Sequence, residues 1–425
     1  MISADIFTII TMWYVYILKC RNNYLYTGIT NDLKRRLDEH RQGKGGRFTR
    51  SFGARKLVYH EGCATRSDAL TREAQIKSLT RQKKLALVMK KITPVTLLMC
   101  LLVLSPLCYA YERVNPRGPM AIKNQMPLYL FWYAFPQEKA AVVAPQRLEA
   151  ALDYTVSNVI IDKVTTPTEE YIVQADMEVN RYNLNVRYGI IEKLEASAEI
   201  PYLVVSKGYL DDFIPGFERA IGATAVGARQ RAEKYQFKYV VQHNYRDVMR
   251  LQEPPAGLGD IAVAAKYMLI DEMQGLPRVS VRGALKFPTA SKGTYLGTGK
   301  FDGGLGLLLD KSFGRLFFYG NANAVFINKP SFLDEFTMKG YIISGMLGLE
   351  YCFTERFSGA LQGTLSSTPY PKTGTDPLDN PAGECALGLN YQFTVNSNWH
   401  IAVVENMFAD SSPDVTFQAG GRIKF

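Results

Sequence analysis

The chain has 425 residues, which is enough for at least two domains, and it contains neither a solenoid-type repeat nor a low-complexity run, so a repeat protein is excluded. Its six cysteines have no spacing that matches a zinc site. The net charge of +10 is unevenly distributed: up to Lys91 there are 19 Lys and Arg against 7 Asp and Glu, a net of +12, and the remainder has a net of −2. A segment this basic favours a polyanionic partner such as nucleic acid, although a solvated basic face would give the same charge.

Two short β-rich runs open the basic segment. Trp13–Cys20 and Tyr24–Thr30 are separated by three residues and therefore predict a β-hairpin. A loop of that length places Tyr16 opposite Gly28. Four tyrosines then share one face of the hairpin: Tyr14, Tyr16, Tyr24 and Tyr26. A glycine opposite a tyrosine predicts a hollow where a phosphate backbone could approach.

A helix is expected next, with Asn31 as its N-terminal cap and Gly43–Gly46 at its end. One stripe of this helix, at positions i, i+3, i+4 and i+7, consists of Leu33, Arg36, Leu37 and His40. The stripe therefore combines two core leucines with an arginine and a histidine.

A third strand is predicted at Lys56–Glu61, and a second helix follows it. Thr65 and Asp68 resemble a capping box at the start of that helix. Its inward side is expected to hold Ala69, Glu73 and Ile76. Because a buried carboxylate needs a partner, Glu73 indicates a nearby cation.

Taken in order, these elements resemble the GIY-YIG endonuclease superfamily, and residues 13–88 look most like its small, stand-alone YhbQ-like branch. The residues that carry the resemblance are Tyr14, Val15 and Tyr16 in the first motif, Tyr26, Thr27 and Gly28 in the second, then Arg36 and Glu73. The resemblance implies an α+β domain with a small antiparallel sheet and flanking helices. It also implies a metal-dependent phosphodiester hydrolase that acts on DNA.

The resemblance also implies a role for each site residue. Tyr16 would activate the attacking water, Glu73 would hold Mg²⁺ or Mn²⁺, and Arg36 would stabilise the charged transition state. Tyr26 and His40 would assist at the phosphate. The residues expected to bind nucleic acid are Lys34, Arg35, Lys44, Arg47 and Arg50. The asparagine that many members carry near the end of the domain has no equivalent here, so an inactive nucleic-acid-binding domain is the alternative.

The segment that follows has the order of a signal peptide. Met89 precedes two lysines, an apolar run covers Val95–Leu104, and Cys108–Ala110 resembles a cleavage site. The run is about half the roughly 20 residues that a membrane-spanning helix needs; a buried core helix is the alternative. Because an export signal must emerge before a folded domain, we hypothesise that the chain joins two reading frames, a cytoplasmic nuclease-like protein and a barrel precursor that begins at Met89.

From Gln146 onward the sequence alternates with period two. Tyr341–Phe353 is one such run, and a short turn separates it from the next run, which begins at Phe357. About twelve such strands predict an all-β antiparallel up-and-down transmembrane barrel, with a soluble β-sandwich as the alternative. The last strand ends on Phe425, which resembles the signal that the barrel-assembly machinery recognises.

Charged residues in this half fall on the inner phase of the strands. They are Asp260, Lys266, Arg278, Arg282 and Lys286, and they predict either a salt-bridged lumen or a selective pore. Lys207–Gln236 breaks the alternation and is expected to be a plug, a lid or an extracellular loop. Residues 127–425 resemble an uncharacterised family of proteobacterial outer-membrane barrels. That resemblance implies outer-membrane lipid and the assembly machinery as partners, and it identifies neither a solute nor a partner protein.

The domain boundaries that follow are an N-terminal extension at 1–12, a GIY-YIG domain at 13–88, a signal-like segment at 89–110, a linker at 111–145 and a barrel at 146–425.

Overall fold

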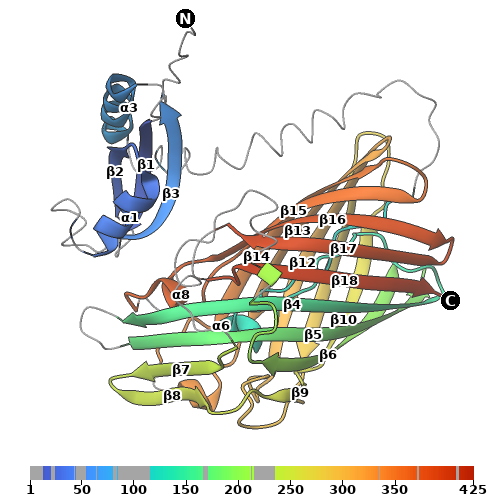
Figure 1. The fold of residues 1–425 in the computed structure, drawn as a ribbon. Coiled ribbons are helices and arrows are strands. Elements are labelled where there is room, and N and C mark those ends of the chain that lie inside the picture. The colour runs from blue at the N-terminus through green and yellow to red at the C-terminus, as the bar shows by residue number, and fades with distance from the viewer. Residues whose placement is uncertain are drawn as a thin grey trace, which may run out of the picture. The chain divides into compact units, whose positions relative to one another are not determined.

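The computed structural model describes residues 13–20, 24–42, 44, 54–63, 65–79, 84, 115–165, 171–211, 213–214, 235–334, 336–370, 373–407 and 411–425. The chain divides into two units, one that includes Met1–Tyr109 and one that includes Ala110–Ala223 and Ala232–Phe425 (Figure 1). The expected N-terminal extension, the signal-like segment, Arg47, Arg50 and most of Lys207–Gln236 lie outside the described residues. No helix within the described part of the chain is long and apolar enough to cross a membrane.

Among its described residues, the first unit has a three-stranded antiparallel sheet of strand order β2-β1-β3 and two helices. Its elements are β1 (Trp13–Cys20), β2 (Leu25–Thr30), α1 (Leu33–Arg41), β3 (Ala54–Cys63) and α3 (Arg66–Ser78). Val15 and Ile17 on β1 pack with Ala69 and Ile76 of α3 to form the core. Tyr16 lies on the opposite face of β1, because neighbouring residues of a strand alternate between the two faces.

The caps and the register explain how these elements form. Tyr16 pairs with Gly28, which confirms the register predicted for the hairpin. The predicted cap at Asn31 is wrong: Asp32 caps α1, and its carboxylate accepts from the backbone N–H of Arg35 at 3.0 Å. Asp32 has extended backbone and sits three residues before that N–H, the separation at which a short side chain reaches it. In α3 the predicted cap is confirmed, since Thr65 accepts from the N–H of Asp68 at 3.1 Å.

The second unit is a closed antiparallel barrel. Its large sheet has fifteen strands, of which three lie outside the ring, so twelve form the barrel, as the sequence predicted. Each barrel strand pairs with the next in the chain, and pairing of the last with the first closes the ring. The twelve are β4 (Leu148–Thr165), β5 (Tyr171–Ile191), β6 (Leu194–Ser206), β10 (Ala262–Ile270), β11 (Arg278–Lys286), β12 (Asp302–Phe313), β13 (Leu316–Phe326), β14 (Tyr341–Cys352), β15 (Phe357–Ser366), β16 (Ala382–Thr394), β17 (Ser397–Asn406) and β18 (Val415–Lys424).

Short elements lie at the barrel's margins. They are β7 (Lys238–His243) and β8 (Arg246–Leu251), which extend from β5, β9 (Ala256–Leu258) beside β6, and the helical turns η3 (Ser331–Leu333) and α8 (Asp376–Asp379). One further helical turn, α6 (Pro127–Leu130), is buried in the segment that precedes β4.

The barrel strands place polar side chains inside and apolar side chains outside. In β14, Glu350 is fully buried whereas Leu347 is 78% exposed. The same alternation runs through β18, where Thr416 and Gln418 are buried and Ile423 is exposed. The β-sandwich alternative is wrong, because one sheet closes on itself and, in the part of the chain that the structure describes, no second sheet covers its apolar face.

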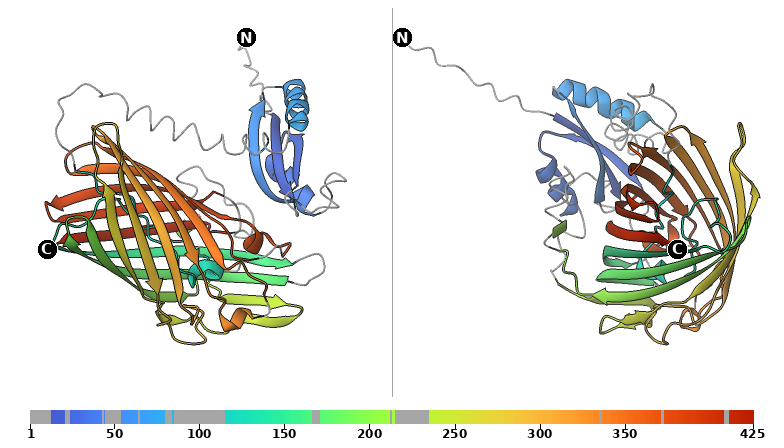
Figure 2. Two further views of the ribbon diagram at one scale, coloured as in Figure 1. Left: turned by 180° about the vertical axis from the view of Figure 1, so that it is seen from behind. Right: turned by 90° about the vertical axis from the view of Figure 1, so that its right-hand side faces the viewer.

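The segment predicted to be a linker instead lies inside the barrel. Residues 115–147, which we call the plug segment, precede β4 and run within the ring of strands (Figure 2). Met120, for example, donates its backbone N–H to Gln362 on the inner face of β15 at 2.9 Å. The sequence suggested a linker because the segment has neither a helical nor a strand period. Its dense apolar run Leu128–Phe135 is nevertheless buried against the inner wall.

Candidate functional site

Three of the predicted site residues, Tyr16, Arg36 and His40, meet on one side of the small sheet. The hydroxyl of Tyr16 on β1 lies 2.8 Å from Nε2 of His40 on α1, and both residues are buried. Arg36, one turn earlier on α1, donates from Nε to the same hydroxyl at 3.3 Å. The i, i+4 spacing of Arg36 and His40 presents both side chains to one strand residue. The mixed stripe predicted for α1 is therefore the face that contacts Tyr16.

Gly28 permits this arrangement. A Cβ at this position would lie 2.6 Å from the Tyr16 hydroxyl, so a larger residue would force that ring to move. The hollow predicted above Gly28 is consequently filled by Tyr16 itself, because the ring leans across the neighbouring strand. The ring of Tyr26 completes the cluster, with its centre 5.2 Å from that of His40 and 6.4 Å from that of Tyr16.

Burial determines the protonation states in this cluster. Burial raises the pKa of Tyr16 to about 12, although the hydrogen bond from Arg36 opposes the rise. Burial, helped by the charge of Arg36, lowers the pKa of His40 to about 4. Near pH 7, Tyr16 is therefore a neutral phenol and His40 a neutral imidazole. The Tyr16 hydroxyl can accept from Arg36 while it donates to His40, provided that Nε2 of His40 carries no proton.

Glu39 orients the arginine and was missed by the sequence reasoning. Its carboxylate accepts from Arg36 at 2.6 Å and also pairs with Arg35. This hydrogen bond is the main reason that the pKa of Arg36 is raised. The i, i+3 spacing of Arg36 and Glu39 was a signal that could have revealed the pair. The guanidinium side chain of Arg36 remains 30% exposed and can reach a ligand from solvent.

Glu73, the predicted metal ligand, lies on α3. Its ion pair is with Lys77 at 2.9 Å, and its negative charge is a minor cause of the raised pKa of Tyr16. Within the described residues no three His, Cys, Asp or Glu side chains gather as a metal site. One carboxylate with waters is nevertheless an ordinary ligand set for Mg²⁺, so Glu73 fits a weakly held ion.

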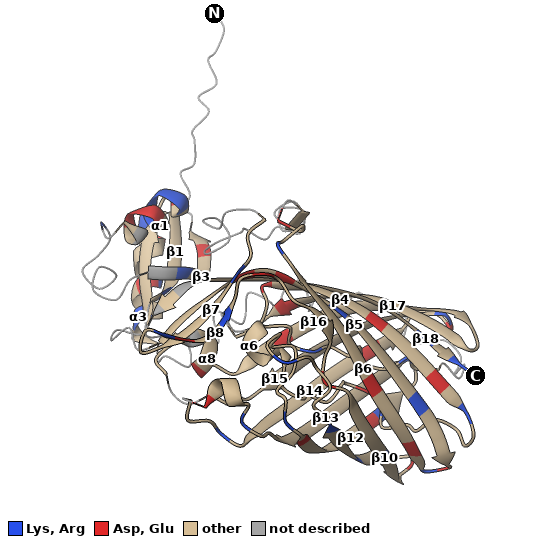
Figure 3. Ribbon diagram, turned by 90° about the horizontal axis from the view of Figure 1, so that it is seen from below, with Lys and Arg blue, Asp and Glu red and all other residues tan. Residues whose placement is uncertain are grey.

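The remaining predicted residues divide between surface and core. Lys34, Arg35 and Lys44 are exposed, and the basic positions of α1 are blue in Figure 3. Val15 and Thr27 are buried, and the register places them on the core face, away from Tyr16. These two motif residues therefore support the sheet and do not line the cluster. Tyr14 lies on the cluster's face of β1, with its ring 6.4 Å from that of His60.

In the barrel, the predicted inner charges form ion pairs. Lys266 pairs with Glu195 at 2.9 Å, and Lys286 pairs with Asp260 at 2.7 Å and with Asp302 at 2.9 Å. Arg278, near the end of its strand, pairs with Asp271, and Arg282 pairs with Glu138 of the plug segment. These ion pairs agree with the predicted salt-bridged lumen, and the selective pore stays a prediction.

Phe425 extends the alternation of β18 on the outside. Its side chain is exposed, and its backbone N–H donates to the carbonyl of Leu148 at 2.8 Å. The last residue therefore continues the pairing of the last strand with the first strand.

Comparison with known proteins separates the two halves. Residues 12–86 match the GIY-YIG catalytic domain, and residues 92–425 match the family described as "Protein of unknown function (DUF3187)". A UPF0213 protein of Clostridium perfringens is 49% identical over 80 residues, which are 19% of this chain and 86% of that protein. A UPF0213 protein of Pseudomonas aeruginosa is 50% identical over 72 residues, which are 17% of this chain and 69% of that protein.

Among solved structures, the COG4313 outer membrane channel from Pseudomonas putida F1 is similar at 10% identity, with a TM-score of 0.45, over 67% of this chain and 98% of that one. The chain thus belongs through residues 92–425 to the DUF3187 family, and its N-terminal domain is a GIY-YIG domain of the UPF0213 family.

Proposed function

We propose that residues 13–88 form a metal-dependent phosphodiester hydrolase that acts on DNA. The observation that carries this proposal is the contact of Tyr16 with both Arg36 and His40. Membership of the GIY-YIG family supports it, and so does the net charge of +12 up to Lys91. A basic surface favours association with a phosphate backbone.

The geometry suggests how this chain's residues divide the work. Arg36 binds the phosphoryl group and stabilises the charge that develops there, because its guanidinium is both held by Glu39 and open to solvent. Tyr16 positions the attacking water and takes a proton from it while its own phenolic proton passes to neutral His40 across 2.8 Å. Glu73 would hold Mg²⁺, which when bound polarises a phosphoryl oxygen and favours ionised forms nearby.

A plasmid-nicking assay on residues 12–88 with Mg²⁺ tests the proposal. Arg36→Ala and Glu73→Ala are each expected to lower the cleavage rate about 100- to 1000-fold, the usual cost of removing a group that stabilises transition-state charge. Arg66→Ala is the matched control, since Arg66 lies over the ring of Trp13 and outside the cluster. Cleavage that both changes leave intact would remove this assignment. DNA binding without any wild-type cleavage would indicate the inactive binding domain instead.

We also propose that the barrel resides in the bacterial outer membrane. The observation that carries this second proposal is the inversion of its surface, with apolar side chains outside and ion pairs inside. Exposed aromatic residues near one end of the strands resemble the aromatic girdle of membrane barrels; they are Tyr391, Phe393 and Trp399. Phe425 would carry the assembly signal. Heat-modifiable migration on gels and recovery in the outer-membrane fraction are expected, and a protein recovered in the soluble fraction contradicts the location.

The two halves are proposed to work as separate products, with the nuclease-like domain in the cytoplasm. Support comes from the two unrelated families, and from relatives that align over most of their own length with only 19% of this chain. Antibodies against each half provide the test by immunoblot. Two smaller bands are expected, and a single band near 47.7 kDa contradicts the separation.

A further inference from the structure

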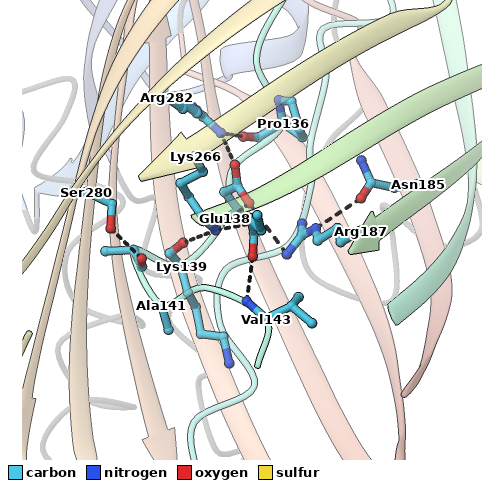
Figure 4. Close-up of polar contacts among 12 residues, drawn as sticks. Pro136, Glu138, Lys139, Ala141, Val143, Asn185, Arg187, Lys266, Ser280 and Arg282 are labelled. Atoms are coloured by element: carbon cyan, nitrogen blue, oxygen red, sulfur yellow. Dashed lines mark hydrogen bonds and ion pairs between the residues drawn. The ribbon is translucent and has the colours of Figure 1, made fainter. Parts of the chain in front are cut away.

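A buried acidic residue of the plug segment sits among three cations of the barrel wall. Glu138 accepts from Nζ of Lys266 at 2.9 Å and from the guanidinium of Arg282 at 2.6 Å, and the guanidinium of Arg187 lies 3.5 Å away (Figure 4). These cations come from β10, β11 and β5, three different strands. The carboxylate therefore joins the plug segment to a broad arc of the wall.

The wall cations differ in how much they depend on Glu138. Lys266 also pairs with Glu195, and Arg187 also lies within 3.6 Å of Glu149. Within the described residues the ion pair of Arg282 is with Glu138, and its other hydrogen bonds are to Pro136 of the plug segment and to Asn323. Loss of the Glu138 charge would leave the guanidinium of Arg282 buried without a carboxylate, which is strongly unfavourable.

The inward-facing side chains of the barrel strands, which form the wall, also make hydrogen bonds to the backbone of the plug segment. The plug segment has little regular secondary structure of its own. Carboxylates of the wall accept from plug N–H groups: Glu350 from Gly118 at 3.0 Å, Asp310 from Ala140 at 2.8 Å and Glu195 from Val143 at 2.6 Å. Ser280 donates to the carbonyl of Ala140 at 2.6 Å. Buried backbone groups must find partners, so this wall is chemically matched to an extended peptide along the length of the segment.

Two of the cavities between the plug segment and the barrel strands are small. One lies beside Trp132 and one beside Phe135, and their volumes are about 10 Å³ each. A volume of that size holds about one water molecule. The plug residue Glu138 and the inner charges Lys266 and Arg282 are correspondingly buried.

We propose that the barrel lumen is a binding site for residues 115–147 of its own chain, that Glu138 locks this plug through Arg282 and Lys266, and that release of the plug opens a path for small solutes. The inference goes beyond the proposed outer-membrane location and rests on it only for the conductance readout. In this ion pair, Glu138 belongs to the plug segment and Arg282 belongs to the barrel strand β11.

The test compares the full chain with Glu138→Gln. Glu192→Gln, in the exposed β5–β6 turn, is the matched control. After reconstitution in lipid bilayers, Glu138→Gln is expected to raise the open probability at least tenfold over wild type and control. In detergent, Met120→Cys on the buried plug is expected to react with a water-soluble maleimide at least tenfold faster when Glu138→Gln is present, in a background where the native cysteines are serine.

Each outcome decides a different point. Maleimide labelling that stays at the control level overturns the plug inference, and so does wild-type conductance equal to that of Glu138→Gln. Faster labelling in a protein that does not insert into bilayers contradicts the membrane location and supports the plug. Insertion and faster labelling without conductance show that release of the plug opens no path. Where Glu138→Gln does not form a heat-modifiable barrel, Arg282→Gln breaks the lock from the wall, and labelling equal to wild type there overturns the inference.

Discussion

The two units of this chain bury opposite kinds of side chain. In the small domain, Val15 and Ile17 are fully buried, and Lys34 and Arg35 of α1 are exposed. In the barrel, Lys286 is 2% exposed, whereas Leu347 is 78% exposed. Both patterns of burial follow from one requirement, that the outer surface of each unit match its surroundings. The surroundings are water for the domain and, in the proposed location, lipid for the barrel. The comparison shows that the period of a strand indicates two faces, and that the kind of side chain on each face, together with the surroundings, decides which face is inside.

Both units nevertheless place a polar cluster in a buried position. In the domain the cluster is small and mostly neutral, because burial keeps both Tyr16 and His40 uncharged near pH 7. In the barrel the clusters consist of ion pairs such as that of Lys286 with Asp260. A site for a charged substrate must leave one charge open, and Arg36 does so. A structural lumen pairs its charges with one another.

The largest expected effect would come from removing a charge inside the barrel. Lys286→Met leaves Asp260 and Asp302 buried without their cation, which should destabilise the barrel by about 3–5 kcal/mol. Guanidinium unfolding in lipid vesicles measures the change. Lys292→Met, in an exposed loop, should stay within about 0.5 kcal/mol of wild type. Equal stability of the two variants would mean that the inner ion pairs are not needed.

The second prediction concerns a charge added to the outer face of the barrel. Leu347→Arg, in the middle of β14, should cost about 2–4 kcal/mol if that surface faces hydrocarbon. Val395→Arg, in the exposed turn between β16 and β17, should cost no more than about 1 kcal/mol. The same vesicle unfolding experiment measures both. If position 347 tolerates arginine as well as position 395 does, the outer face is in water and the comparison between the units fails.

A pH titration sharpens the account of the small domain. The pKa of His40 is lowered to about 4, below its unfolded value of about 6.5, so the folded state binds its proton later than the unfolded chain. The stability that His40 contributes is therefore full above pH 6.5 and is lost as the pH falls towards 4, by about 2 kcal/mol at pH 4.5. Urea unfolding of residues 12–88 at pH 7 and 4.5 measures this loss. His40→Asn should remove that part of the pH dependence, and an unchanged slope would contradict the buried neutral histidine.

The smallest expected effect concerns a helix end that both sequence and structure assign. Thr65→Ala removes the cap of α3 and should lower the stability of the small domain by about 1 kcal/mol. Ser67→Ala, an exposed neighbour in the same helix, should change it by only a few tenths. Thermal unfolding of residues 12–88 compares the two. A loss that is the same at both positions would mean that the capping bond contributes nothing.

Much of the candidate site could be predicted because it depends on local rules. The three-residue loop sets the register of Tyr16 against Gly28, and helical spacing places Arg36 and His40 on one stripe. Two details could not be predicted in this way. The space above Gly28 depends on which way the Tyr16 ring leans, and the partner of Glu73 is Lys77, where the site hypothesis expected a metal. Both depend on side-chain rotamers, which a sequence pattern does not specify.

The sequence by itself determined the twelve-strand barrel, its charged inner phase and the motif order of the small domain, since strand alternation and helix spacing act between residues close in the chain. Only the tertiary structure decided that residues 115–147 occupy the lumen and that Glu138 is the partner of Arg282. Those two residues are 144 positions apart. The two residues come into contact because the ring of strands closes around the segment. Periodicity within a single strand gives no information about such a contact.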